Sequence, residues 1–224
     1  MSAARALFGR LIDHAPTFPP AELPVAEAIE EDRRARDSAE SWILARLAWP
    51  ASKLGELEGE DRELTVIVDG NLVLPDSRIA AVEMRSVPPA GEAVEVYVEG
   101  AELDEVAARG YRAKIRCGGE RVPSVDELAD FIRGCKERAL PFKATAGLHH
   151  AVRRNGAHGF LNLLAAAVFD EEGLAEEDAE AFRVSEDAFH WRDRSAPPDR
   201  GLFLSFGSCS FFEPVEELKA LGLV

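Results

Sequence analysis

Two lysines inside otherwise apolar, strand-like segments have the clearest chemical potential in this chain. Lys114 falls in RAKIRC and Lys143 in PFKATAG. A lysine inside an apolar strand is costly unless it reaches a pocket or a partner. If both face one interior, their mutual repulsion lowers the pKa of one of them, and a neutral amine near pH 7 can condense with a carbonyl group. The alternative is that each lysine is paired with Glu83 or Glu99 in a structural network.

Other polar side chains stand at the ends of the expected strands. Parallel α/β folds place their sites at the carboxyl ends of strands. Glu83 and Glu99 end two of them, and we expect one of these carboxylates to transfer protons. Residues that could hold a small anion beside the lysines are Arg116, Gly118, Gly119, Thr145 and Ser208. The glycine-bearing loops let backbone N–H groups approach an anion. They match no nucleotide-binding motif.

The histidines after Lys143 are candidates for proton transfer. His149 and His150 lie in the following loop, and imidazole titrates near neutrality. A metal site would combine two of His149, His150 and His158 with Glu83, Glu99 or Cys209. Adjacent histidines on an extended segment point in opposite directions, so we expect no metal and no cofactor.

Two further groups of residues have simpler interpretations. The pair Asp13-His14 is interpreted as the end of a first helix, with His14 at the negative helix terminus. Cys117, Cys135 and Cys209 form an odd set without CxxC spacing, which indicates buried free thiols. Cys209 lacks any sequence signature of a nucleophile.

Periodicity predicts strands alternating with helices. We expect strands over 42–49, 63–68, 79–84, 94–98, 112–117, 141–145 and 202–206. Helices are expected over 3–14, 22–37, 102–109 and 161–169. Two more are expected to begin at a capping box formed by Ser124 and Glu127 and at Pro214. Residues 182–191 are expected to form a hairpin. This alternation indicates parallel pairing and right-handed crossovers.

The number of expected strands favours one α/β domain over residues 1–224, a (β/α)8 barrel of the TIM type. About ten residues separate the second strand from the third and the third from the fourth. Because a parallel crossover normally needs a dozen or more residues, we expect the barrel to be degenerate there, with a missing helix or an antiparallel pair. An open parallel sheet is the alternative.

The overall charge limits the possible partners. The formal net charge is −15, which disfavours binding to nucleic acid or anionic lipid. Many of the cations fall between Lys114 and Arg154, as expected for a basic pocket that takes a small anionic substrate. Without a long apolar run or a signal peptide, a cytoplasmic location is expected. Phe211 and Phe212 are expected to cover the barrel bottom or a subunit contact, so a homo-oligomer is possible.

The run PFKATAGLHH resembles the strand-lysine motif of class I aldolases of the deoxyribose-phosphate aldolase type. The matching positions are Lys143, Ala144, Thr145, Ala146 and Gly147, with Ala144 replacing a hydroxyl residue. The resemblance implies that Lys143 forms a Schiff base and that Lys114 tunes it, although the two lysines then stand in the reverse of the family's order. The blocks HAPTFPPA, KIRCGG, FKATAGLHH, HGFLNLL and FGSCSFFEP also resemble an uncharacterised bacterial family, which implies no activity.

These observations lead to three hypotheses about function. The first is a metal-independent lyase, similar to an aldolase, that acts on a small anionic carbonyl compound through Lys143. The second is a non-enzymatic small-molecule binding or scaffold protein whose lysines belong to a buried ion-pair network. The third is a metal-dependent hydrolase or isomerase that uses His149, His158 and strand carboxylates.

Overall fold

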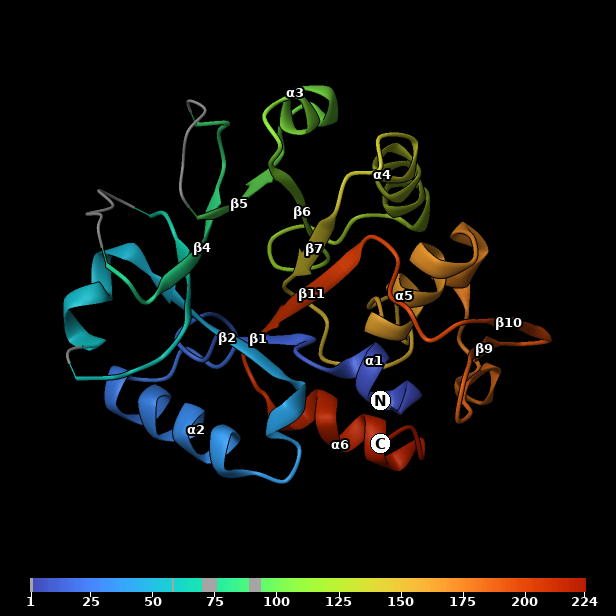
Figure 1. The fold of residues 1–224 in the computed structure, drawn as a ribbon, viewed down its shortest axis with the longest axis horizontal. Helices are drawn as coiled ribbons and strands as arrows, with labels where there is room; N and C mark the ends of the chain where they lie inside the picture. Colours follow the sequence, from blue (N-terminus) through green and yellow to red (C-terminus); the bar gives the residue numbers. More distant parts are fainter. Residues whose placement is uncertain (1, 58, 70–75, 89–93) are drawn as a thin grey trace.

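The chain forms a closed barrel of eight parallel strands in a computed structural model that describes residues 2–57, 59–69, 76–88 and 94–224 (Figure 1). The barrel strands are β1 (Ile12–His14), β2 (Leu44–Pro50), β3 (Leu64–Ile67), β4 (Ile79–Met84), β5 (Glu95–Glu99), β6 (Arg112–Arg116), β7 (Phe142–Thr145) and β11 (Phe203–Ser208). They neighbour one another in chain order, and β11 closes the barrel against β1. The predicted TIM-like barrel is confirmed, and the sheet is not open.

Helices surround the barrel, and the apolar core fills the space between helices and strands (Figure 1). The α-helices are α1 (Ala3–Phe8), α2 (Val25–Asp37), α3 (Leu103–Ala108), α4 (Val125–Glu137), α5 (Phe160–Val168) and α6 (Phe212–Ala220). Short 3₁₀ segments are η1 (Ser41–Ile43), η2 (Ala51–Leu57), η3 (Glu171–Ala175) and η4 (Ala179–Ala181). Helix α4 begins with the predicted capping box of Ser124 and Glu127. Within the described residues, no helix is both long and apolar enough to cross a bilayer.

The first barrel strand replaces the end of the expected first helix. Helix α1 ends at Phe8, Gly9 follows it, and residues Ile12–His14 pair with both β2 and β11. The interpretation of Asp13-His14 as a helix terminus is therefore wrong. The strand is only three residues long, which is too short to show the alternation of apolar and polar residues that is typical of a strand. The helical apolar pattern of the residues before it therefore determined the prediction.

The two short connections join parallel neighbours, so the antiparallel alternative is wrong. Strands β3, β4 and β5 pair in parallel. The described residues of both connections contain no helix, although parts of each, residues 70–75 and 89–93, lie outside the described chain. This agrees with the expected degeneracy of the barrel at this point.

Two features lie outside the barrel strands. The predicted hairpin over 182–191 is confirmed as β8 (Phe182–Val184) and β9 (Phe189–Trp191), which are joined by β10 (Arg194–Ala196) in a small antiparallel sheet. Phe211 is fully buried and Phe212 partly buried, directly after the carboxyl end of β11. The expectation that they cover the barrel bottom is therefore wrong.

Candidate functional site

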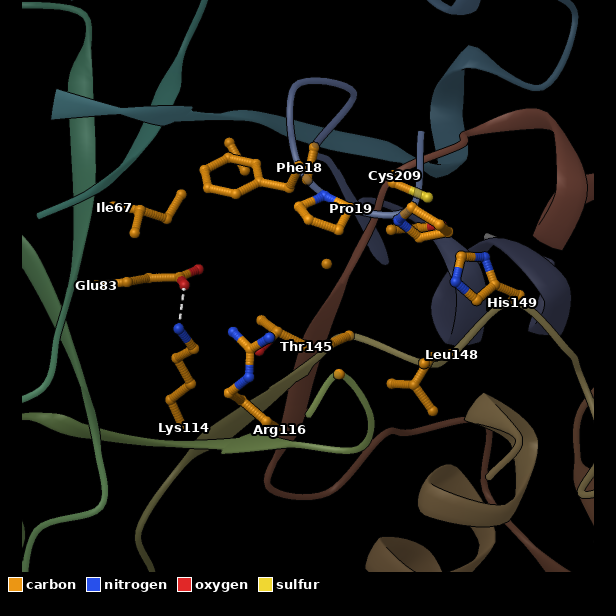
Figure 2. A pocket seen from close by; sticks show the side chains of 18 residues that line it. Phe18, Pro19, Ile67, Glu83, Lys114, Arg116, Thr145, Leu148, His149 and Cys209 are labelled. Carbon is orange, nitrogen blue, oxygen red and sulfur yellow. Dashed lines mark ion pairs between the residues drawn. The ribbon is translucent and has the colours of Figure 1, made fainter. Parts of the chain in front are cut away.

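A cavity of about 360 Å³ opens at the carboxyl ends of the barrel strands (Figure 2). Its polar lining includes Glu83, Lys114, Arg116, Thr145, His149, Ser208 and Cys209, and its apolar lining includes Phe18, Pro19, Pro20, Ile67 and Leu148. This is the end at which parallel barrels place their sites. A mixture of apolar walls and a few convergent polar groups is typical of small-molecule sites.

Lys114 reaches this cavity between two carboxylates. Its Nζ lies 2.7 Å from Oε2 of Glu83 and 2.9 Å from Oε2 of Glu99. The Lys114 side chain is 7% exposed and that of Glu99 is 21% exposed. The predicted pairing of strand lysines with Glu83 and Glu99 is therefore confirmed for Lys114, which also lines the cavity.

Lys143 lies in the closed interior of the barrel and does not line the cavity. Its fully buried ammonium group is paired with Asp13 and lies 2.6 Å from Oε1 of Glu83 and 5.1 Å from the centre of the Tyr97 ring. Burial alone would lower the pKa of Lys143, but attraction by Asp13 and Glu83 outweighs it and raises the pKa above its ordinary value. The expected mutual repulsion of the two lysines is therefore wrong, because carboxylates separate them.

Glu83 connects the two lysines. One of its oxygens contacts Lys143 and the other contacts Lys114. Burial alone would raise the pKa of Glu83, but the two cations lower it to about 2. Glu83 therefore stays ionised near neutral pH. Of the two carboxylates that were expected to transfer protons, only Glu99 is partly exposed, so it is the one that can accept and return a proton.

Strand register explains how these side chains meet. Lys114 pairs with Glu99 on β5 and with Lys143 on β7, and Lys143 pairs with Ser205 on β11. Residues at the same level of neighbouring parallel strands point to the same side of the sheet. The sequence alternation that placed Lys114 and Arg116 on one face is confirmed, since both line the cavity.

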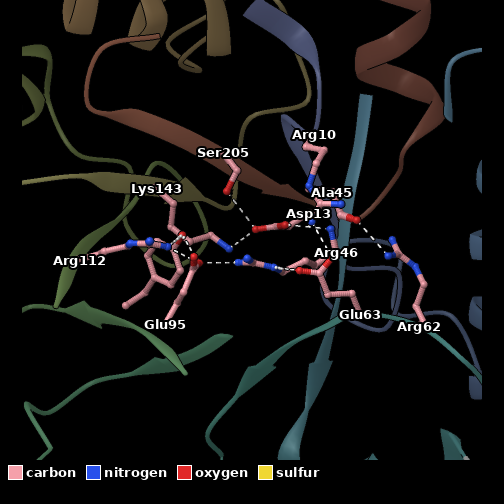
Figure 3. A network of polar contacts seen from close by, with 11 residues as sticks. Arg10, Asp13, Ala45, Arg46, Arg62, Glu63, Glu95, Arg112, Lys143 and Ser205 are labelled. Atoms are coloured by element: carbon pink, nitrogen blue, oxygen red, sulfur yellow. Dashed lines mark hydrogen bonds and ion pairs between the residues drawn. The ribbon is translucent and has the colours of Figure 1, made fainter. Parts of the chain in front are cut away.

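Below Lys143 the barrel interior continues as a network of charges (Figure 3). Asp13 accepts hydrogen bonds from Ser205 Oγ at 3.1 Å and from the backbone N–H of Arg46 at 3.2 Å. Arg46 pairs with Glu63 at 2.9 Å and with Glu95 at 2.8 Å. Arg112 also pairs with Glu95. A TIM barrel is usually filled with branched apolar side chains, so this polar interior is a specific feature of the chain.

The expected anion-binding residues are only partly brought together. Arg116, Gly119, Thr145 and Ser208 line the cavity. No carboxylate in the described part of the chain pairs with Arg116, and the buried Oγ1 of Thr145 has no hydrogen-bond partner in the structure. Gly118 does not line the cavity. A Cβ there would approach the Cα of Gly147 to 2.7 Å, so Gly118 permits close contact between the loops after β6 and β7.

The histidines separate into three environments. His149 lines the cavity. His150 instead lines an adjacent groove, where its Nδ1 lies 3.0 Å from Glu217. His158 is fully buried, and its Nε2 lies 2.7 Å from the carbonyl oxygen of Pro123. The combination of His149 with His158 in one site is therefore wrong, and within the described residues no three such side chains are grouped to hold a metal ion.

Two residues of the network were missed by sequence reasoning. Asp13 was assigned to a helix, although its position between apolar Ile12 and buried His14 fits a strand. Tyr97 falls within the predicted strand over 94–98 but was not singled out. Its position two residues before Glu99 is a period-2 signal that could have placed it inside the barrel. His14 points away from the barrel, where its Nδ1 lies 3.2 Å from Asp32.

The depressed pKa of Glu83 predicts a loss of stability in acid. Glu83 stabilises the fold fully above pH 4.5, its ordinary pKa, and this contribution is lost as the pH falls through about 2. The shift corresponds to about 3 kcal/mol. Urea unfolding at several pH values measures how steeply the free energy of unfolding falls with pH. Between pH 5 and pH 3 this slope should be smaller for Glu83→Gln than for the unmodified chain. Glu105→Gln, at an exposed position, should leave the slope unchanged, and equal slopes for all three proteins would contradict the assignment.

Comparison with known proteins adds no assignment to this cavity. No protein-family model, curated protein or solved structure matches the chain. The function must therefore be inferred from the arrangement of Lys114, Glu83, Glu99 and Arg116 around the cavity.

Proposed function

We propose that the chain is a lyase, similar to a class I aldolase, that forms a Schiff base between Lys114 and a small anionic carbonyl compound. The observation that supports this most strongly is the position of Lys114. Of the two barrel lysines, it is the one that lines the cavity, and a partly exposed carboxylate lies 2.9 Å from its Nζ. A nucleophilic amine, a proton acceptor and a small chamber are the parts that carbonyl condensation requires.

The two lysines therefore exchange the roles that the sequence motif implied. Lys143 is fully buried between Asp13 and Glu83, and it has no cavity in which to meet a substrate. Its raised pKa also keeps it protonated, and an ammonium group is not a nucleophile. With Lys114 as the reacting amine, the lysine of the PFKATAG run no longer has the role that the resemblance implied, so the support for this function comes from the geometry of the cavity.

The reaction begins with a proton transfer from the Lys114 ammonium group to Glu99. The neutral Nζ then attacks the carbonyl carbon of the substrate, so that a C–N bond forms and the carbonyl electrons move to oxygen. One proton moves from Nζ to this oxygen and Glu99 returns the other, so that the oxygen leaves as water and an iminium ion remains. The iminium ion accepts electrons from the adjacent carbon, which allows a C–C or C–H bond there to break.

Glu83 and Lys143 support this step electrostatically. Glu83 stays ionised, with a pKa of about 2, and lies 2.7 Å from the Lys114 nitrogen that becomes an iminium cation. Lys143 and Asp13 hold Glu83 in place from the barrel interior. A fixed charge at the position where charge develops needs no reorganisation during the reaction.

The anionic group of the substrate would be held by Arg116. Arg116 lines the same cavity and has no carboxylate partner in the described chain, so its charge is available to a ligand. A guanidinium group can bind a carboxylate or phosphate through two parallel hydrogen bonds. The unpartnered hydroxyl of Thr145 offers a further polar contact.

Borohydride trapping with a panel of carbonyl compounds tests this function. We expect pyruvate and glyoxylate to give more covalent adduct, seen by intact-protein mass, than acetone and acetaldehyde at equal concentration. Arg116→Gln should lower the yield with the anionic compounds by about tenfold, equivalent to about 1.4 kcal/mol of lost binding. Arg121→Gln, at an exposed arginine outside the cavity, should leave it unchanged. A folded protein that gives no adduct with any compound would overturn the proposal.

A further inference from the structure

A cysteine and a histidine form the end of the cavity that lies away from Lys114 (Figure 2). Cys209 is 7% exposed. Both Cys209 and His149 line the cavity and also the adjacent groove. The Nδ1 of His149 lies 3.1 Å from Oε2 of Glu213, the second residue of helix α6. A thiol, an imidazole and a carboxylate are therefore grouped where the cavity meets the adjacent groove, and Glu213 contacts His149 from the groove side.

This combination of groups is one that activates a thiol. The thiolate is the nucleophilic form of cysteine, and a neighbouring imidazolium favours it. A carboxylate on the other ring nitrogen holds the imidazole and stabilises its charge. The neighbouring Cys209 side chain, and then Glu213, raise the pKa of His149 to about 9 against the opposing effect of burial, so that this imidazole carries a proton near neutral pH.

We propose that Cys209 is a second nucleophile of this cavity, activated by His149 and Glu213, and that it reacts with small anionic electrophiles whose reactive carbon lies next to a carboxylate. The anionic class follows from the unpartnered Arg116 and the charged His149 that line the same small chamber. With an α-halocarboxylate, the sulfur forms a bond to the α carbon, the carbon–halogen bond breaks, and halide leaves with its electron pair. The thiol proton passes to solvent, because His149 is already protonated, and the imidazolium stays beside the sulfur during the attack.

The other two cysteines provide internal controls for this reaction. Cys117 and Cys135 are free and buried, and neither lines the cavity. Burial raises the pKa of each to about 12, so both remain protonated near neutrality. The inference goes beyond the proposed imine chemistry, because alkylation of Cys209 requires no reaction at Lys114 and is measured without a carbonyl compound.

Short pulses of iodoacetate and iodoacetamide at pH 7, followed by peptide mass spectrometry, test the proposal. We expect Cys209 to react at least about tenfold faster than Cys117 and Cys135. His149→Gln should slow alkylation at Cys209 about tenfold or more, and Glu213→Gln should slow it less. His190→Gln, in the distant small sheet, should not change the rate. Circular dichroism confirms that each variant is folded.

The charge of the reagent tests the ligand class. The ratio of the iodoacetate rate to the iodoacetamide rate at Cys209 should exceed the ratio for glutathione, and Arg116→Gln should reduce it. A ratio equal to that of glutathione would overturn the anionic class. Alkylation of Cys209 no faster than that of the buried cysteines, or an unchanged rate in folded His149→Gln, would overturn the activated thiol.

Discussion

Replacement of Lys143 with methionine is expected to lower the free energy of unfolding by about 3–5 kcal/mol. Lys143 is fully buried between Asp13 and Glu83, so the substitution leaves Asp13 without its ion-pair partner inside the barrel and leaves Glu83 paired with Lys114 alone. Removing one partner of a buried ion pair costs much more than removing a surface lysine. Because a domain of this kind is stable by only about 5–15 kcal/mol, the loss is a large part of the total.

Urea unfolding of matched variants measures this effect. Lys53→Met, at an exposed lysine, should change stability by less than about 1 kcal/mol. The double variant Lys143→Met with Asp13→Asn should be more stable than Lys143→Met alone, because it removes the Asp13 charge that the single substitution leaves unpaired. A Lys143→Met protein as stable as Lys53→Met would contradict the structural role of Lys143.

The ion pairs of the two lysines bear differently on the sequence hypotheses. The non-enzymatic hypothesis expected the strand lysines to form a buried ion-pair network, and the ion pairs of Lys143 agree with that part of it. Lys114 shares Glu83 with that network but extends into the cavity. One lysine therefore contributes to the fold, and we assign the reaction to the other.

The barrel could be predicted from the sequence because its signals are local. Alternating strand and helix periods, the capping box before α4 and glycine-ended strands each arise from neighbouring residues. The strand β1 was missed because three residues are too few to show a period beside a strong helical pattern. Because this strand was not predicted, Asp13 was not recognised as a residue of the barrel interior, although it contacts Lys143, which lies 130 positions later in the sequence.

The candidate site was predicted less completely, because side-chain pairing depends on register around the whole barrel. Alternation correctly grouped Lys114 with Arg116. It could not show that Glu83 separates the two lysines, since this depends on the register of β4 against β5 and of β5 against β6. The sequence also could not show that Cys209 and His149 line the same cavity, because they belong to loops after different strands.

Replacement of Lys114 with arginine is expected to abolish imine formation while the protein stays folded. A guanidinium group retains the positive charge between Glu83 and Glu99, so the buried carboxylate network keeps its partner. It cannot release a proton and condense with a carbonyl group, because a guanidinium group is not deprotonated in proteins. The yield of borohydride adduct with pyruvate or glyoxylate should therefore fall to that of protein treated with borohydride alone.

Lys53→Met is the matched control for this variant, since it removes a lysine that does not line the cavity. Lys53→Met should give the same yield of borohydride adduct as the unmodified chain under the same conditions. Circular dichroism and the urea midpoint show whether Lys114→Arg keeps its fold. An undiminished adduct in folded Lys114→Arg would mean that another amine reacts with the carbonyl compound.

The reacting amine is identified most directly by peptide mass spectrometry of the unmodified chain after treatment with glyoxylate and borohydride. Of the five lysines in the sequence, we expect the added mass on the peptide that contains Lys114 and none on the peptide that contains Lys143. Added mass on Lys143, with Lys114 unmodified, would contradict the assignment of the cavity lysine as the nucleophile.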